Sequence, residues 1–176
     1  MANELKTLLS KIKVNSEMLI VEKNRKTSKK SRLIASQQQV LRYDKESIED
    51  ITTNSEKRII EIFSENINKY DAIILSDYGK GILTLSLTKD IIFTANKYNK
   101  KVFVDPKGKD YFKYKGAYTL TPNKKEAIEA TNINISDNKK LEEALKYLKD
   151  TCNLEISLIT LSENGIAIFD DTLRIK

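Results

Sequence analysis

Short apolar segments alternate with segments of helical periodicity from residue 71 onward, and this alternation limits the possible folds most. The apolar segments are residues 71–77, 101–105, 118–121 and 156–160. Between them, apolar residues recur every three or four positions over 87–98 and 141–148, which predicts helices. Strands that are apolar on both faces and alternate with helices are typical of a parallel sheet packed against helices. The sequence therefore predicts an α/β fold with a mostly parallel sheet.

The N-terminal third of the chain does not follow this plan. Apolar residues over 5–12 predict an amphipathic helix, and residues 18–21 and 33–43 predict two strands. The basic stretch 23–32 is interpreted as an exposed hairpin loop. We expect these strands to form a small separate β element, with Ser55 as the N-cap of the helix that follows.

Two shorter patterns complete the prediction of secondary structure. Pro122 stands where a helix would begin. Residues 162–165 are predicted as a turn, and 166–169 with 173–176 as a hairpin around Asp170 and Asp171.

The composition excludes several kinds of chemistry and compartment. Histidine is absent and Cys152 is the single cysteine, which excludes Ser/His/Asp and Cys/His catalysis and disfavours structural zinc. No apolar run is long enough to cross a bilayer, no secretion signal is seen, and no internal disulfide can form, so we expect a cytoplasmic protein. The net charge is +6, but the lysines are spread over the whole chain. A nucleic-acid surface at 23–32 is therefore the weakest interpretation, and no nucleic-acid partner is predicted.

Four predicted turns follow the predicted strands and contain acids, lysines, amides and glycines. They are residues 76–81, 105–108, 121–126 and 161–165. Each alone is explained by a tight turn or a helix cap. Because ligands of open parallel sheets bind at the carboxyl ends of the strands, the four turns together indicate a binding edge.

The residue types in these turns suit a phosphate ligand. Asn123 and Lys124 stand at a predicted helix start, where free N–H groups attract anions. Lys80 and Lys107 can neutralise phosphate oxygens, and Glu126 can orient Mg²⁺ through water. The sequence contains neither a P-loop motif nor the Gly-rich loop of protein kinases.

The four turns, in this order, resemble those of the ribokinase (PfkB) family of sugar kinases. Asn123-x-x-Glu126 is similar to the family's Asn-x-x-Glu motif, which serves Mg²⁺ and the nucleotide phosphates. Residues 76–81 resemble its substrate-side turn. Residues 160–165 resemble its Thr-x-Gly-x-x-Gly turn, with Ser162 in place of the first glycine, as in the heptose kinase branch.

Two further segments resemble the kinase half of the bifunctional heptose kinase/ADP-heptose synthases. One comprises Asp-Pro-Lys-Gly at 105–108, Tyr-x-Gly-Ala at 114–117 and Leu-Thr-Pro-Asn at 120–123. The other comprises Arg32, the pair Gln38-Gln39, and Arg42-x-Asp44, which in that family lie on a small β lid beside the sugar. The resemblance covers the chain from about Leu5 onward.

The resemblance implies a three-layer α/β/α fold with a β lid, ATP and Mg²⁺ as cofactors, and a sugar phosphate as substrate. Residues 1–176 would be part of one kinase domain, with the lid strands within about 17–44 and the α/β core over about 55–176. A homodimer through the lid is implied as well. The implied ATP- and phosphate-binding residues are Asn123, Lys124, Lys125, Glu126, Lys107, Ser162 and Gly165, with Glu126 also serving Mg²⁺. The implied substrate-binding residues are Asp77, Lys80, Arg32, Gln38 and Arg42.

The implied reaction is ATP-dependent phosphorylation of D-glycero-β-D-manno-heptose 7-phosphate at its anomeric hydroxyl. The family's Gly-Gly sugar-binding segment is expected before this sequence, and its Gly-Ala-Gly-Asp motif, which carries the catalytic base, after Lys176. We therefore expect a fragment with both ends of the kinase domain missing, without turnover and prone to self-association. The alternatives are a ribokinase-like kinase of another sugar (ribose, a ketodeoxy sugar acid or a sugar phosphate) and a non-catalytic remnant.

Overall fold

The apolar segments of the sequence become neighbouring strands of one sheet. The computed structural model describes residues 2–170. Strands β3 (Ala72–Ser76), β4 (Lys101–Asp105) and β5 (Thr119–Leu120) pair in parallel, in that order. Strand β6 (Ser157–Thr160) continues the sheet, because the Ile156 N–H donates to the Tyr118 carbonyl at 3.1 Å and the Thr160 N–H to the Pro122 carbonyl at 2.9 Å. Strand β7 (Ile166–Phe169) then pairs antiparallel with β6.

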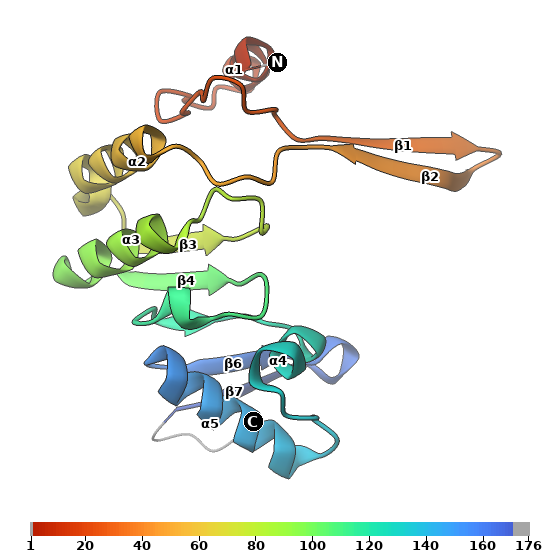
Figure 1. The fold of residues 1–176 in the computed structure, drawn as a ribbon, viewed down its shortest axis with the longest axis vertical. Helices are drawn as coiled ribbons and strands as arrows, with labels where there is room; N and C mark the ends of the chain where they lie inside the picture. Colours follow the sequence, from red (N-terminus) through yellow and green to blue (C-terminus); the bar gives the residue numbers. More distant parts are fainter. Residues whose placement is uncertain (1, 171–176) are drawn as a thin grey trace.

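Helices connect these strands and pack on one face of the sheet (Figure 1). They are α2 (Thr53–Asn66), α3 (Leu85–Lys97), α4 (Lys124–Thr131) and α5 (Asn138–Cys152), with 3₁₀ turns η1 (Ile67–Lys69), η2 (Phe112–Tyr114) and η3 (Ser162–Asn164). Helix α1 (Ala2–Lys11) precedes them, as the apolar spacing predicted. None of the helices within residues 2–170 combines the length and apolar character needed to span a lipid bilayer.

The core lies between the helices and one face of the sheet. Leu75, Val104 and Leu120 occupy paired positions on neighbouring strands and are all buried. Burial of each such side chain contributes roughly 1.5–3 kcal/mol. The paired residues Ile74 and Phe103 lie on the other face, where Ile74 is 77% exposed. The sheet is therefore well packed on one face and open at Ile74 on the other.

A β-hairpin projects from the body of the molecule (Figure 1). It consists of β1 (Lys29–Ala35) and β2 (Gln38–Lys45), joined by Ser36 and Gln37, whose φ angles are 46° and 67°. The prediction of a single strand over 33–43 was therefore wrong. Two-residue hairpin turns need positive φ values and usually contain Asn-Gly or Asp-Gly, so Ser-Gln carries no such signal. The basic stretch 23–32 is a loop only up to residue 28, because the strand begins at Lys29.

Other boundaries differ from the prediction for local reasons. The predicted strand at 18–21 is irregular chain, because its backbone joins no sheet among the described residues. Helix α2 is capped by Thr52, whose hydroxyl oxygen accepts the Ser55 N–H at 3.3 Å. Both residue types cap helices well, so the sequence did not distinguish them. Residues 166–169 form β7 and pair with β6, whereas 173–176, the second strand of the hairpin predicted around 170–171, lie outside the described residues.

Gly81 joins the hairpin segment to the sheet. Its carbonyl accepts the Ile51 N–H at 2.8 Å, and its φ is +70°. A Cβ atom at this position would lie 2.1 Å from the carbonyl oxygen of Glu49. Only glycine allows the two backbones to approach this closely.

We expect Gly81→Ala to destabilise the protein more than Gly108→Ala. Both glycines have positive φ, which costs alanine about 1–2 kcal/mol, but a Cβ atom at Gly108 meets nothing within 4 Å. The clash at Gly81 adds about 2 kcal/mol to the loss in free energy of unfolding. Urea denaturation of the two variants measures the difference, and equal losses would contradict the close approach.

Candidate active site

The ends of the parallel strands bring the predicted turns to one edge of the sheet. Ser76 and Asp105 are paired at the ends of β3 and β4, and the Asp77 N–H donates to the Asp105 carbonyl at 2.9 Å. An isolated parallel bridge joins Asn123 to Thr160, so the turn after β6 lies beside the start of α4. The arrowheads of β3 and β4 point toward the side over which the hairpin projects (Figure 1). The four turns therefore share one rim.

Asp77 is the buried acid of this rim, and its side chain is bonded entirely within the protein. The residue is 6% exposed. Its Oδ1 accepts the Gly79 N–H at 2.7 Å, and its Oδ2 accepts from Lys113 Nζ at 2.5 Å and from the Tyr114 hydroxyl at 2.7 Å. Burial acts to raise the pKa of Asp77, but the hydrogen bonds from these donors outweigh burial and hold the pKa below its usual value. Asp77 is therefore a charged anchor for the turn at 77–81.

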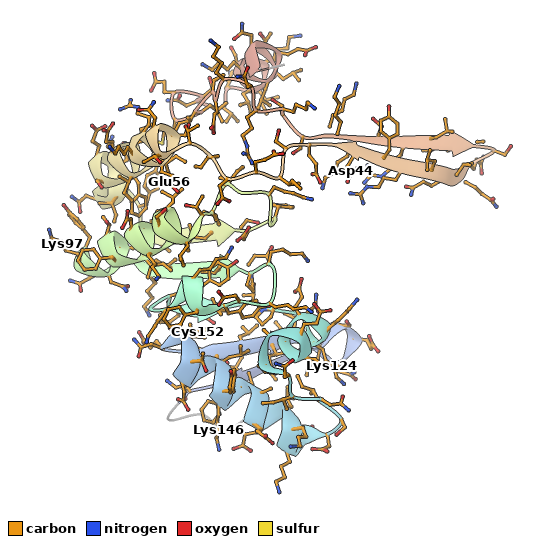
Figure 2. The ribbon with its side chains drawn as sticks, in the orientation of Figure 1. Asp44, Glu56, Lys97, Lys124, Lys146 and Cys152 are labelled. Atoms are coloured by element: carbon orange, nitrogen blue, oxygen red, sulfur yellow. The ribbon has the colours of Figure 1, made fainter. Side chains whose placement is uncertain are left out.

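The start of α4 carries a reciprocal cap. The Glu126 N–H donates to Asn123 Oδ1 at 3.0 Å, and the Asn123 N–H donates to Glu126 Oε2 at 3.1 Å. Lys107 Nζ lies 2.9 Å from Glu126 Oε1. Burial acts to raise the pKa of Glu126, but Lys107 and the Asn123 N–H lower it further than burial raises it. Figure 2 shows Lys124 at the start of this helix, and both Lys124 and Lys125 are exposed there.

This geometry suits an anion better than a directly bound metal. Two lysine side chains are exposed in the first turn of α4, at the positive end of the helix dipole. Within residues 2–170 no group of three His, Cys, Asp or Glu side chains could hold a metal ion. Glu126 alone therefore fits only a contact to Mg²⁺ through water, with phosphate oxygens completing the shell.

Ser162 and Gly165 form the turn beside Asn123. Both have positive φ, 53° and 83°, and the Gly165 N–H donates to the Ser162 carbonyl at 3.1 Å. Both residues are exposed, and a Cβ atom at Gly165 would meet nothing within 4 Å. The turn therefore presents an open surface next to the start of α4.

The hairpin has two different faces. Arg32 is paired with Arg42, and Lys30 with Asp44, so these four residues share one face. Lys30 Nζ lies 5.6 Å from the ring centre of Tyr78, so this face is turned toward the turn at 77–81. Figure 2 labels Asp44 on this side of the hairpin, and Arg42 Nη2 lies 2.8 Å from Asp44 Oδ2.

A β-bulge separates Gln38 from the two arginines. Leu33 pairs with Leu41 but Ile34 pairs with Gln39, so Val40 is an extra residue in β2. Because paired residues share a face, Gln39 lies on the arginine face and Gln38 on the opposite one. The structure thus groups Arg32 and Arg42 with Gln39, whereas the sequence prediction had selected Gln38.

Lys80 is tied to the base of the hairpin. Its ammonium forms an ion pair with Glu46, and its carbonyl accepts a hydrogen bond from the Arg25 guanidinium. It also lines a cavity of about 1030 Å³ at the base of the hairpin, together with Ile51 and Ile82. The structure therefore places the Lys80 ammonium at the base of the hairpin.

Sequence reasoning missed three residues that organise this rim. Lys113 and Tyr114 bind Asp77, and Arg25 donates to the backbone carbonyls of Glu49 and Lys80. Tyr114 was noted only as part of a motif. Nothing in the sequence marks Lys113 or Arg25 among the many basic residues of the chain.

Comparison with known proteins agrees with this architecture. The family description "pfkB family carbohydrate kinase" matches residues 1–176. The bifunctional protein HldE of Aliarcobacter butzleri is 70% identical over 175 residues, which are 99% of this chain and 37% of that protein. The bifunctional protein HldE of Sulfurimonas denitrificans is 55% identical over 172 residues, covering 98% of this chain and 36% of that protein. The chain therefore spans little more than a third of the length of these relatives.

Solved structures share the fold at low sequence identity. Phosphofructokinase-2 from Escherichia coli, in its tetrameric inhibited form, superimposes with a TM-score of 0.72 at 15% identity, over 99% of this chain and 57% of that one. Ribokinase from Arabidopsis thaliana, complexed with ribose and ATP, gives a TM-score of 0.55 at 14% identity, over 77% of this chain and 43% of that one. The ribokinase-like α/β fold predicted from the sequence is confirmed.

Stability should decrease in acid through Asp77. Its folded-state pKa is depressed, so its contribution is complete above the unfolded value near 4 and is lost as the pH falls toward the folded value. Asp77→Asn leaves Lys113 without its counter-charge and should cost about 3 kcal/mol at pH 7. The variant should also lose less stability than the wild type between pH 4 and pH 3.

Denaturant unfolding at several pH values measures both effects, with Asp90→Asn on the exposed side of α3 as the matched control. The control should keep the wild-type stability at pH 7 and the wild-type loss in acid. An Asp77→Asn variant as stable as the wild type at pH 7 would refute the anchoring role.

Proposed function

Because the chain belongs to the pfkB family of carbohydrate kinases, we propose that it is the central part of a heptose 7-phosphate kinase. The proposed substrate is D-glycero-β-D-manno-heptose 7-phosphate, and the γ-phosphoryl group of ATP goes to its anomeric hydroxyl, giving the 1,7-bisphosphate. The observation that carries the proposal is the shared rim of the Asp77 turn and the Asn123–Glu126 helix start, under a hairpin face with two arginines. The high identity to HldE proteins supports the same assignment.

The α4 end of the rim is proposed to hold the nucleotide phosphates. Phosphoryl transfer depends mainly on positioning and on neutralising charge. Lys107, Lys124 and Lys125 offer ammonium groups beside the start of α4, and Ser162 and Gly165 border the nucleotide. Mg²⁺, when bound with ATP, would neutralise phosphate charge, with Glu126 orienting one of its waters.

The hairpin end of the rim is proposed to hold the sugar phosphate. The guanidinium group of Arg32 suits bidentate recognition of the 7-phosphate, and Arg42 adds positive charge on the same face while its Nε and Nη2 donate to Asp44. Gln39 is a neighbouring amide on the same face. On the sugar side, Asp77 is proposed to hold the turn at 77–81 in place. Lys80 is proposed to hold the base of the hairpin through its ion pair with Glu46. A reaction that draws on ATP is proposed to take place in the cytoplasm.

The proposed catalytic base is not among these residues. The 176-residue sequence contains no Gly-Ala-Gly-Asp motif, the segment expected to carry that base. We therefore propose that this chain alone binds nucleotide but does not turn over substrate. The 1,7-bisphosphate would feed the synthesis of ADP-heptose for lipopolysaccharide.

A chimera tests the proposed reaction. We expect the A. butzleri HldE protein, with its matching 175 residues replaced by this chain, to phosphorylate the heptose 7-phosphate with ATP. In the chimera, Arg32→Gln should raise the KM for the heptose about tenfold or more, because a charge-assisted hydrogen bond contributes about 1.5–3 kcal/mol. Steady-state kinetics measures both values.

Lys29→Gln is the matched control, because it removes one charge from the opposite hairpin face. It should leave the KM within about twofold of the unsubstituted chimera. A chimera that phosphorylates ribose or fructose 6-phosphate but not the heptose would overturn the substrate assignment. Equal effects of Arg32→Gln and Lys29→Gln would overturn the choice of hairpin face.

The second face of the hairpin is proposed to pair with another copy of the chain. Leu33, Leu41 and Tyr43 share this face and are 58%, 53% and 60% exposed. A projecting hairpin with apolar side chains and open edges favours association with a second copy. The arginine face remains directed toward the rim.

We expect the wild-type chain to be dimeric and the double variant Leu33→Glu, Leu41→Glu to be monomeric, as measured by sedimentation velocity. Charges buried in the proposed interface would not be solvated. Ile34→Glu adds charge to the arginine face at a comparably exposed residue and should leave the dimer intact. A monomeric wild-type chain, or a double variant that still dimerises, would contradict this interface.

A further inference from the structure

The Tyr114 hydroxyl lies between two parts of the rim that come from different strands. Tyr114 is fully buried, with 0% exposure. Its hydroxyl donates to Asp77 Oδ2 at 2.7 Å and accepts the Lys107 N–H at 3.1 Å. The Lys107 carbonyl, at 3.3 Å, is a competing acceptor, but the shorter bond to a carboxylate is the stronger one. One hydroxyl group thus links the turn after β3 to the turn after β4.

The link continues to the start of α4. The Lys107 backbone N–H donates to the Tyr114 hydroxyl, and the Lys107 side chain pairs with Glu126 at 2.9 Å. Glu126 in turn accepts the Asn123 N–H at 3.1 Å. Hydrogen bonds at both ends of Lys107 therefore connect Asp77 and Tyr114 to the cap of α4, with the lysine side chain between them.

The protonation state of the Tyr114 hydroxyl allows it to keep both of its hydrogen bonds. Burial raises the pKa of Tyr114, with the Asp77 carboxylate raising it further, so the hydroxyl keeps its proton over the physiological range. A hydroxyl can donate and accept at once, which neither phenylalanine nor an ionised side chain can do here. The hydroxyl thus links Lys107 to Asp77 in addition to the bond from the Asp77 N–H to the Asp105 carbonyl.

We propose that Tyr114 is a positioning residue, which sets the Lys107–Glu126 pair at a fixed place relative to the Asp77 turn. Its hydroxyl holds the phosphate end and the sugar end of the rim at a fixed relative position. The γ-phosphate of ATP and the acceptor hydroxyl of the sugar can then approach each other. The functional part of this inference rests on the proposed kinase reaction, whereas the mechanical part concerns only the chain itself.

Tyr111 provides a matched control. It is also buried, at 4% exposure, and its ring packs against Tyr114 with 5.9 Å between ring centres. Its hydroxyl has no hydrogen-bond partner among the described residues. Tyr111→Phe and Tyr114→Phe therefore remove the same atom from neighbouring buried rings, but only the second removes a link.

Two measurements on the 176-residue chain test the inference. Amide hydrogen exchange by NMR should show the Lys107 N–H exchanging at least tenfold faster in Tyr114→Phe and within twofold of wild type in Tyr111→Phe. Titration with Mg·ATP should show Tyr114→Phe binding about tenfold more weakly, as Lys107→Met does, and Tyr111→Phe binding within twofold of wild type. The double variant Tyr114→Phe, Lys107→Met should bind no more weakly than Lys107→Met alone, because Tyr114 acts through Lys107.

The results of these measurements distinguish a failure of this inference from a failure of the proposed function. Unchanged Lys107 exchange in Tyr114→Phe overturns the inference, and so does additive weakening in the double variant. If the wild-type chain binds no Mg·ATP while Tyr114→Phe still speeds Lys107 exchange, the nucleotide site is refuted but the mechanical link stands. Equal changes in both tyrosine variants would assign the effect to ring packing and overturn the role of the hydroxyl.

Discussion

The in-register parallel pairing of β3 with β4 is the constraint on which the rim depends. Because Ser76 and Asp105 end their strands side by side, the turns that follow start from adjacent points. The Asp77 N–H to Asp105 carbonyl bond extends the pairing one residue beyond the strands. Shifting the register by one residue would turn the buried Leu75 to the open face and offset the two turns. Packing of the core and geometry of the site therefore depend on the same backbone pairing.

The buried charge of Asp77 holds the two neighbouring turns in a defined conformation. A carboxylate removed from water must be paired and hydrogen-bonded, and here the Gly79 N–H, Lys113 and Tyr114 supply the donors. The donors come from two different segments, so satisfying one charge holds two turns together. Lys107 extends the same network to α4. The proposed binding groups at the surface are thus supported by polar contacts beneath them.

The hairpin has two faces of different chemical character. Strand alternation places Arg32 and Arg42 on one side and Leu33 and Leu41 on the other. The bulge at Val40 interrupts that alternation near the tip and decides which glutamine joins the arginines. The proposed sugar-phosphate face and the proposed apolar interface therefore lie on opposite sides of one two-stranded element.

The sequence by itself determined the α/β class, the strands at 72–76 and 101–105, and the turns at their carboxyl ends. These follow from local apolar periodicity and from the rule that parallel strands end at one edge. Only the tertiary structure decided that 29–45 is a bulged hairpin, that Gln39 lies with the arginines, and that Asp77 is anchored by Lys113 and Tyr114. The physical reason is distance along the chain. Periodicity reports on neighbours within a few residues, whereas Asp77 and its two partners are more than thirty residues apart and meet only when the sheet has formed.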